Sequence, residues 1–273
     1  MFDDELEPLV RIAISAGEVI RDLRRTNQGW TQKADGSPVT VADQAAEDLI
    51  VAELAKIRPD ATIIAEERVA DGQVPEITDG SFYLVDALDG TREYVNGRDE
   101  YTVNIARIEN GVPVLGVVVA PSLDQGFAAN NTGARKFSIA DGCAFDIQPI
   151  CARPRPHELV AVVSRSHATP ETLTYLEQFH VGSQVSFGSS LKLCKVAEGA
   201  ADIYPRLGRT MEWDIAAGDA ILRGAGGTIA QVDGREFVYG KTDQEHDAPF
   251  ANPHFVVFGA WTKEDIQKSF VGS

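Results

Sequence analysis

Two aspartates stand at the end of a short apolar run in the first half of the chain. Asp86 and Asp89 follow residues 82–85, Phe-Tyr-Leu-Val, a run that is continuously apolar and rich in β-formers and therefore predicts a buried strand. At the end of such a strand, two carboxylates would face the crevice where open sheets bind ligands. Gly90 then turns the chain, and Thr91 adds a hydroxyl oxygen. The pattern predicts a magnesium site that handles phosphate.

Acidic residues also stand at other expected strand or helix ends: Asp43, Glu66 with Glu67, and Asp214. Each has a structural explanation as well. Asp43 and Asp214 can cap helices, and the two glutamates can be ordinary surface charges. Only the aspartate pair after the apolar run indicates function unaided, because two carboxylates at a buried strand end require a compensating cation.

The kinds of side chain available favour one class of metal. Carboxylates without a histidine or cysteine cluster favour magnesium over zinc, and the five histidines have no metal-ligand spacing. Two magnesium ions about 4 Å apart would activate a water molecule, neutralise phosphate oxygens and stabilise the leaving oxygen. The predicted reaction is therefore hydrolysis of a phosphate ester by direct in-line attack of water.

Composition narrows the possible partners. The 273 residues carry 41 acidic and 25 basic side chains, a formal net charge of −16. Such a chain is a poor candidate for nonspecific binding to nucleic acid or to a membrane surface. No apolar stretch approaches the roughly 20 residues that cross a bilayer, and the acidic N-terminus does not resemble a signal peptide. Three cysteines without a paired spacing suit a reducing compartment, so we expect a cytoplasmic protein.

The N-terminal half predicts helices outside a largely antiparallel sheet. An amphipathic stripe predicts a helix over 5–25, and Thr40 with Asp43 has the capping-box spacing of a second helix that ends before Pro59. The remaining expected elements are a polar loop over 28–38, a strand over 61–65, and a hairpin of 101–108 with 113–120.

The C-terminal half predicts alternating strands and helices after a proline-rich segment. Three prolines within 148–157 predict a boundary between an N-terminal α+β domain, 1–148, and a C-terminal α/β domain, 149–273, that would supply Asp214 and substrate contacts. A strand is expected over 159–164, and helices over 170–179, 192–198 and 215–224.

Three separated motifs together resemble the inositol monophosphatase superfamily. They are Asp-Ala-Leu-Asp-Gly-Thr at 86–91, the upstream Glu66-Glu67, and Trp-Asp-Ile-Ala-Ala-Gly at 213–218. The resemblance implies a layered αβαβα fold and a lithium-sensitive, magnesium-dependent phosphatase. Residues 33–43, 188–192 and 197–206 resemble the CysQ branch of that superfamily. That branch comprises 3'(2'),5'-bisphosphate nucleotidases, which convert adenosine 3',5'-bisphosphate to AMP and phosphate.

The resemblance also assigns roles to individual residues. Glu66, Asp86 and the Leu88 carbonyl would hold the first metal, and Asp86, Asp89 and Asp214 the second. Thr91 paired with Asp43 would orient the attacking water, with Glu66 beside them in the catalytic set, and the Gly90 and Thr91 N–H groups would bind phosphate. The family motif has proline where this chain has Ala87, which should leave the Leu88 carbonyl slightly less pre-organised.

Substrate choice depends on residues farther along the chain. Where the inositol-hydrolysing branch carries a glutamate, seven residues before the Trp-Asp aspartate, this chain has Leu207 preceded by Arg206. An arginine there fits a second phosphate better than a polyol. The positions that hold nucleotide phosphates in relatives correspond to His167, Ser189, Lys192 and Arg206, with Asp214 also facing the substrate. The alternatives are ordinary surface cations and an inositol-1-monophosphatase or related sugar phosphatase.

Other classes fit the chain less well. A haloacid-dehalogenase-type phosphatase needs Asp-x-Asp, whereas Asp86 and Asp89 are three apart, which argues against a covalent aspartyl-phosphate. Ser189-Ser190-Leu191-Lys192 matches the Ser-x-x-Lys of penicillin-recognising hydrolases, but its partner motifs are missing. A non-catalytic metal- or nucleotide-binding module would have lost a ligand, and every expected ligand is present. The sequence leaves open a homodimer and a peripheral attachment to the inner membrane.

Overall fold

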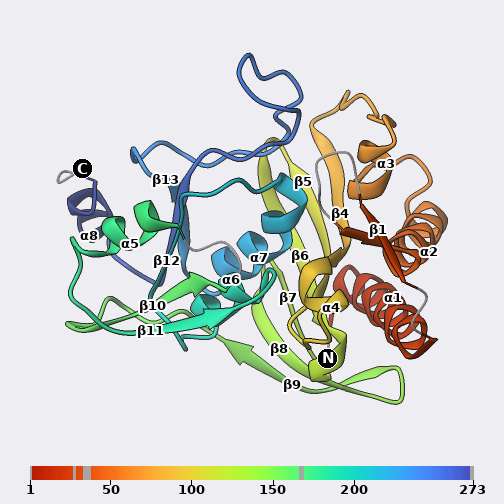
Figure 1. Ribbon diagram of the computed structural model, residues 1–273, viewed down its shortest axis with the longest axis horizontal. Coiled ribbons are helices and arrows are strands. Elements are labelled where there is room, and N and C mark those ends of the chain that lie inside the picture. The colour runs from red at the N-terminus through yellow and green to blue at the C-terminus, as the bar shows by residue number, and fades with distance from the viewer. Residues whose placement is uncertain (1, 27–28, 33–37, 166–168, 271–273) are drawn as a thin grey trace.

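Two β-sheets alternate with three layers of helices in the computed structural model, which describes residues 2–26, 29–32, 38–165 and 169–270. From one side to the other, α1 and α2 cover a seven-stranded sheet, α6 and α7 lie between the two sheets, and α5 and α8 cover the five-stranded sheet (Figure 1). The predicted αβαβα layering is confirmed.

The outer helices follow from apolar periodicity and capping. The first, α1 (Leu6–Thr26), buries Leu6, Leu9 and other residues of one face. The second, α2 (Val41–Ile57), begins after Thr40 with the predicted capping box to Asp43. The expected loop before it is partly wrong, because β1 (Trp30–Gln32) pairs antiparallel with β2 (Pro38–Thr40).

The seven-stranded sheet runs in the order β3 to β9, with only β3 and β4 parallel. Its strands are β3 (Thr62–Ala65), β4 (Ser81–Asp89), β5 (Thr102–Glu109), β6 (Val112–Ala120), β7 (Gln125–Asn130), β8 (Gly133–Ala140) and β9 (Cys143–Ile150). Short helices follow three of them: α3 (Glu66–Ala70), α4 (Thr91–Val95) and the 3-10 turn η1 (Pro121–Leu123). The predicted hairpin of β5 and β6 is confirmed.

The second sheet has the order β11-β10-β12-β14-β13. Its strands are β10 (Leu159–Ser164), β11 (Val181–Phe187), β12 (Ile203–Arg206), β13 (Thr228–Gln231) and β14 (Phe255–Phe258). Its helices are α5 (Pro170–Leu176), α6 (Leu191–Ala197), α7 (Glu212–Gly224) and α8 (Lys263–Lys268). None of the helices that the structure describes has the length and apolar content needed to traverse a bilayer.

The layer of α6 and α7 joins the two halves of the chain. One hydrophobic cluster includes Leu84 and Val118 of the first sheet, Ala216 and Ile221 of α7, and Phe255 of the second sheet. Strand β9 continues to Ile150, beyond the expected boundary at 148/149. The two-domain division stays a prediction, and the halves share a core where α7 packs.

Gly116 of β6 allows α7 to approach the sheet closely. A Cβ atom there would lie 2.4 Å from the Ala217 carbonyl oxygen and 2.7 Å from the Ala220 Cβ. We therefore expect Gly116→Ala to lower the free energy of unfolding by about 1–3 kcal/mol, measured by urea denaturation, because the helix must move outward. An unchanged urea midpoint would show that α7 does not pack this tightly.

Candidate functional site

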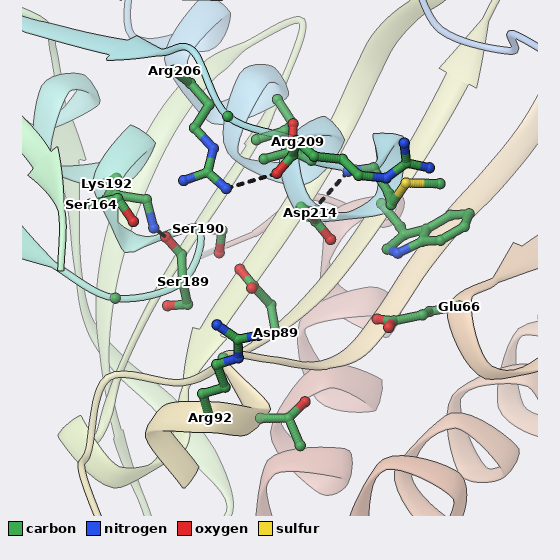
Figure 2. Close-up of a pocket in the computed structure, with 18 of the residues that line it drawn as sticks. Glu66, Asp89, Arg92, Ser164, Ser189, Ser190, Lys192, Arg206, Arg209 and Asp214 are labelled. Carbon is green, nitrogen blue, oxygen red and sulfur yellow. Dashed lines mark hydrogen bonds between the residues drawn. The ribbon is translucent and has the colours of Figure 1, made fainter. Parts of the chain in front are cut away.

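A pocket of about 1000 Å³ lies where the two halves of the molecule meet. Its walls come from α3, the turn between β4 and α4, the beginnings of α6 and α7, and the end of β12. Carboxylates gather at its centre, whereas Lys192 and Arg206 project into it from the α6 and β12 side (Figure 2). The pocket thus has an acidic part and a basic part.

The acidic part collects the predicted metal ligands. Carboxylate oxygens of Glu66, Asp86 and Asp214 lie within 4.8 Å of one another. Glu66 is the first residue of α3, directly after β3, and Asp86 lies in the neighbouring parallel strand β4. Asp214 reaches the same point from the first turn of α7, and Asp89, at the end of β4, also lines the pocket. Residues far apart in sequence therefore form one cluster.

These carboxylates fit a hard cation. Burial, with the charges of Asp89 and Glu66, raises the pKa of Asp214 to about 8. Burial also raises the pKa of Asp89 to about 6, although the neighbouring Lys192 acts in the opposite direction. Crowded carboxylates of this kind resist ionisation unless a cation joins them, and carboxylate oxygens are the ligands that Mg²⁺ and Ca²⁺ take. The donor set is therefore that of a divalent metal site.

Buried polar side chains tie Asp89 to the other half of the molecule. The Ser190 backbone N–H donates to Asp89, and Asn104 Nδ2 lies 3.5 Å from its Oδ2. The Ser190 hydroxyl donates to Asn104 Oδ1 at 2.7 Å and lies 2.8 Å from the Thr102 hydroxyl. Sequence reasoning missed the roles of Asn104 and Ser190. The available signal was that Thr102 and Asn104, two residues apart, place polar side chains on one face at the start of a strand.

Thr91 sits between two acceptors at the start of α4. Its Oγ1 lies 3.1 Å from Asp43 Oδ1 and 3.1 Å from the Leu88 carbonyl oxygen. The other oxygen of Asp43 accepts from the Thr40 N–H and hydroxyl, each at 2.7 Å, and burial raises the pKa of Asp43 to about 6. Asp43 is thus both a helix cap and the partner of Thr91, and its role in orienting a water molecule stays a prediction.

Gly90 is required by the turn between β4 and α4. Its φ is +93°, in the left-handed region, and a Cβ there would lie 3.1 Å from the Glu100 carbonyl oxygen. The same turn holds Asp86, because the Leu88 N–H donates to Asp86 Oδ1 at 3.0 Å. Backbone geometry therefore sets where Asp86, Asp89 and Thr91 point.

The basic part contains the predicted substrate contacts. Lys192 and Arg206 are buried, and burial lowers the pKa of Lys192 to about 8. Lys192 donates to the Ser189 carbonyl, and Arg206 Nη2 donates to the Arg209 carbonyl at 2.8 Å. Among the described residues, Arg206 Nε and Ser189 Oγ are buried polar atoms without a hydrogen-bond partner. His167 lies outside the described residues.

The start of α7 differs from the expectation. Asp214 is not the N-cap: the helix begins at Glu212, and Asp214, in its first turn, accepts from the Met211 N–H at 2.9 Å. A tertiary contact explains why α7 begins three residues before the expected start at residue 215. The fully buried Glu212 pairs with Lys241 Nζ at 2.6 Å and accepts from the Gly240 and Lys241 N–H groups.

Comparison with known proteins agrees with this geometry. Residues 3–254 match the model of the inositol monophosphatase family, and the chain belongs to that family. Within it, the chain is 39% identical over 254 residues to the 3'(2'),5'-bisphosphate nucleotidase CysQ of Escherichia coli K12, covering 92% of this chain and 98% of that protein. It is 40% identical over 254 residues to the protein of the same name from Salmonella typhimurium, again covering 92% of this chain and 98% of that protein.

Solved structures show the same fold. The crystal structure of CysQ from Bacteroides thetaiotaomicron, a bacterial member of the family, matches with a TM-score of 0.76 and 35% identity, covering 95% of this chain and 98% of that one. An IMPase structure from Thermotoga maritima matches with a TM-score of 0.76 at 24% identity, covering 98% of this chain and 97% of that one. The latter supports the fold alone.

The raised pKa of Asp214 predicts a pH dependence of stability in the metal-free protein. An acid with a raised folded-state pKa holds its proton more tightly in the folded state, so the free energy of unfolding falls as pH rises from about 4 to about 8. In chelator, Asp214→Asn should therefore be more stable than wild type at about pH 8, with a smaller difference at about pH 5. Urea midpoints at both pH values check this, and equal midpoints at pH 8 would contradict it.

Proposed function

We propose that this protein is a Mg²⁺-dependent phosphatase that removes the 3'-phosphate of adenosine 3',5'-bisphosphate, leaving AMP and phosphate. What supports this most directly is one pocket that holds both a carboxylate cluster for a metal and buried cations for a second anionic group. The names of the CysQ relatives point to the same reaction.

The metal would be bound by the acidic part of the pocket. Glu66, Asp86 and the Leu88 carbonyl would form one site, and Asp86 with Asp89 and Asp214 a second. Bound Mg²⁺ supplies charge that polarises the phosphate ester and lowers the pKa of water. Sensitivity to lithium and a homodimeric state stay predictions.

The chain's own residues would place the reacting groups. Thr91, which is held by Asp43 and lines the same pocket as Glu66, would orient the attacking water and pass its proton toward the buried Asp43 carboxylate. The Gly90 and Thr91 N–H groups would hold the phosphate oxygens at the start of α4. Water would then attack in line, with no covalent phosphoenzyme.

The second phosphate explains the unsatisfied donors. A buried donor without a partner costs about 1–3 kcal/mol, and an anionic group between Ser189, Lys192 and Arg206 would satisfy it. Asp214 would border the substrate from the opposite side. Hydrolysis of inositol 1-phosphate is the alternative, but a polyol offers hydroxyl groups to these cations where a bisphosphate offers a second charge.

Asp86 is shared by both proposed metal sites, so its loss should abolish turnover. We expect Asp86→Asn to lower phosphate release by more than about a hundredfold, which exceeds the loss typical of residues that only support ligands. Thermal unfolding of the variant shows whether the fold is intact, and the exposed Asp60→Asn is the matched control. Near wild-type turnover by Asp86→Asn would exclude the metal mechanism.

Arg206 should matter for the second phosphate specifically. With Arg206→Leu, we expect kcat/KM for adenosine 3',5'-bisphosphate to fall about 10- to 100-fold, because a charge-assisted hydrogen bond is lost. The loss for adenosine 3'-monophosphate, measured in the same assay, should be several-fold smaller. Equal losses on both substrates would remove the proposed role of Arg206.

A further inference from the structure

Glu66, a proposed metal ligand, is the first residue of a helix that does not cap itself. Helix α3 has five residues, and Ala65 at its N-cap offers no side-chain acceptor. The first N–H groups of a helix have no intrahelical partner, and so short a helix is marginal without capping. The position of Glu66 therefore depends on an acceptor from elsewhere in the fold.

Glu47 of α2 supplies that acceptor. One of its carboxylate oxygens accepts from the Glu67 N–H at 2.7 Å, and the other accepts from the Arg68 N–H at 3.1 Å. Its side chain is 3% exposed, and Arg68 Nε lies 3.8 Å away. A carboxylate buried this deeply, with both oxygens directed at the backbone just after Glu66, acts as a helix cap across 20 residues of sequence.

The same helix also holds Thr91. Asp43 lies four residues before Glu47, and residues four apart share one helix face. Through Asp43, α2 reaches Thr91, and through Glu47 it reaches the backbone of α3. Two parts of the candidate site, which follow different strands, therefore take their positions from one face of α2.

We propose that Glu47 is a positioning residue for the metal site, holding Glu66 in place by capping α3. This inference rests on the proposed function. Glu47 contacts the backbone after Glu66 and is not itself a ligand. Its contribution is to metal affinity, because a ligand on a frayed turn must be ordered each time the metal binds.

Calorimetric titration of the metal-free protein with Mg²⁺ tests this without relying on turnover. Glu47→Gln replaces one of the two accepting oxygens with an NH2 group, which cannot accept from a backbone N–H. Glu47→Asp keeps the charge but shortens the reach. We expect both variants to raise the Mg²⁺ dissociation constant about 10- to 100-fold, the usual effect of losing an outer-shell partner. In the phosphate-release assay, kcat at saturating Mg²⁺ should stay near the wild-type value, since the ligands themselves are intact.

Asp48→Asn is the matched control. Asp48 is the next residue of α2, its side chain is 77% exposed, and it contacts the Arg68 side chain at 3.3 Å without capping α3. This variant removes a charge from the same helix but leaves the Glu47 cap of α3 intact. We therefore expect an unchanged Mg²⁺ dissociation constant.

Several outcomes would overturn the inference. Lower melting temperatures with an unchanged Mg²⁺ dissociation constant would assign Glu47 a structural role alone. A weaker affinity in Glu47→Gln but not in Glu47→Asp would show that charge matters rather than position. If Glu47→Gln does not fold, Glu47→Asp decides, because it retains the buried charge. Wild-type protein that binds no Mg²⁺ would instead contradict the proposed function, and the inference with it.

Discussion

Carboxylates crowded into one pocket are the constraint on which the rest of this structure depends. Carboxylate oxygens of Glu66, Asp86 and Asp214 lie within 4.8 Å of one another. Burial, together with the charges of Asp89 and Glu66, raises the pKa of Asp214, which shows that ionising this site costs free energy. The fold nevertheless holds these side chains in place. The Leu88 N–H fixes Asp86, and the Met211 N–H fixes Asp214. Because the fold holds these carboxylates close together despite that cost, the site is suited to binding a cation.

The layered architecture brings the cluster together. The parallel pair β3 and β4 delivers Glu66 and Asp86 side by side, because neighbouring parallel strands end at the same sheet edge. Helix α7 delivers Asp214 from the other half, and Gly116 lets that helix lie close to the first sheet. The Ser190 N–H then joins the start of α6 to Asp89. The N-terminal half of the chain thus supplies most of the carboxylates, and the C-terminal half supplies Asp214 and the buried cations.

Local signals in the sequence predicted the elements that carry the main motif. The apolar run before Asp86, the capping box at Thr40 and the hairpin of β5 and β6 all follow from short-range patterns, and the structure has each of them. The predicted strand over 82–85 nevertheless continues to Asp89, because Asp89 pairs with Thr102 of β5 beyond a register shift after Asp86.

Long-range contacts could not be predicted in this way. The early start of α7 depends on Glu212 meeting Lys241, and the Asn104–Ser190 contact joins residues 86 positions apart. The cap that Glu47 gives to α3 is of the same kind. The roles assigned to individual site residues rest on the family resemblance and stay predictions.

Phosphate release from three substrates, compared with and without chelator, tests the central claim most directly. In Mg²⁺, kcat/KM for adenosine 3',5'-bisphosphate should exceed that for inositol 1-phosphate and fructose 1,6-bisphosphate by at least about tenfold, the factor that 1.4 kcal/mol of preferential binding provides. Chelation should abolish all release. Release that persists in chelator, or a preference for inositol 1-phosphate, would contradict the account.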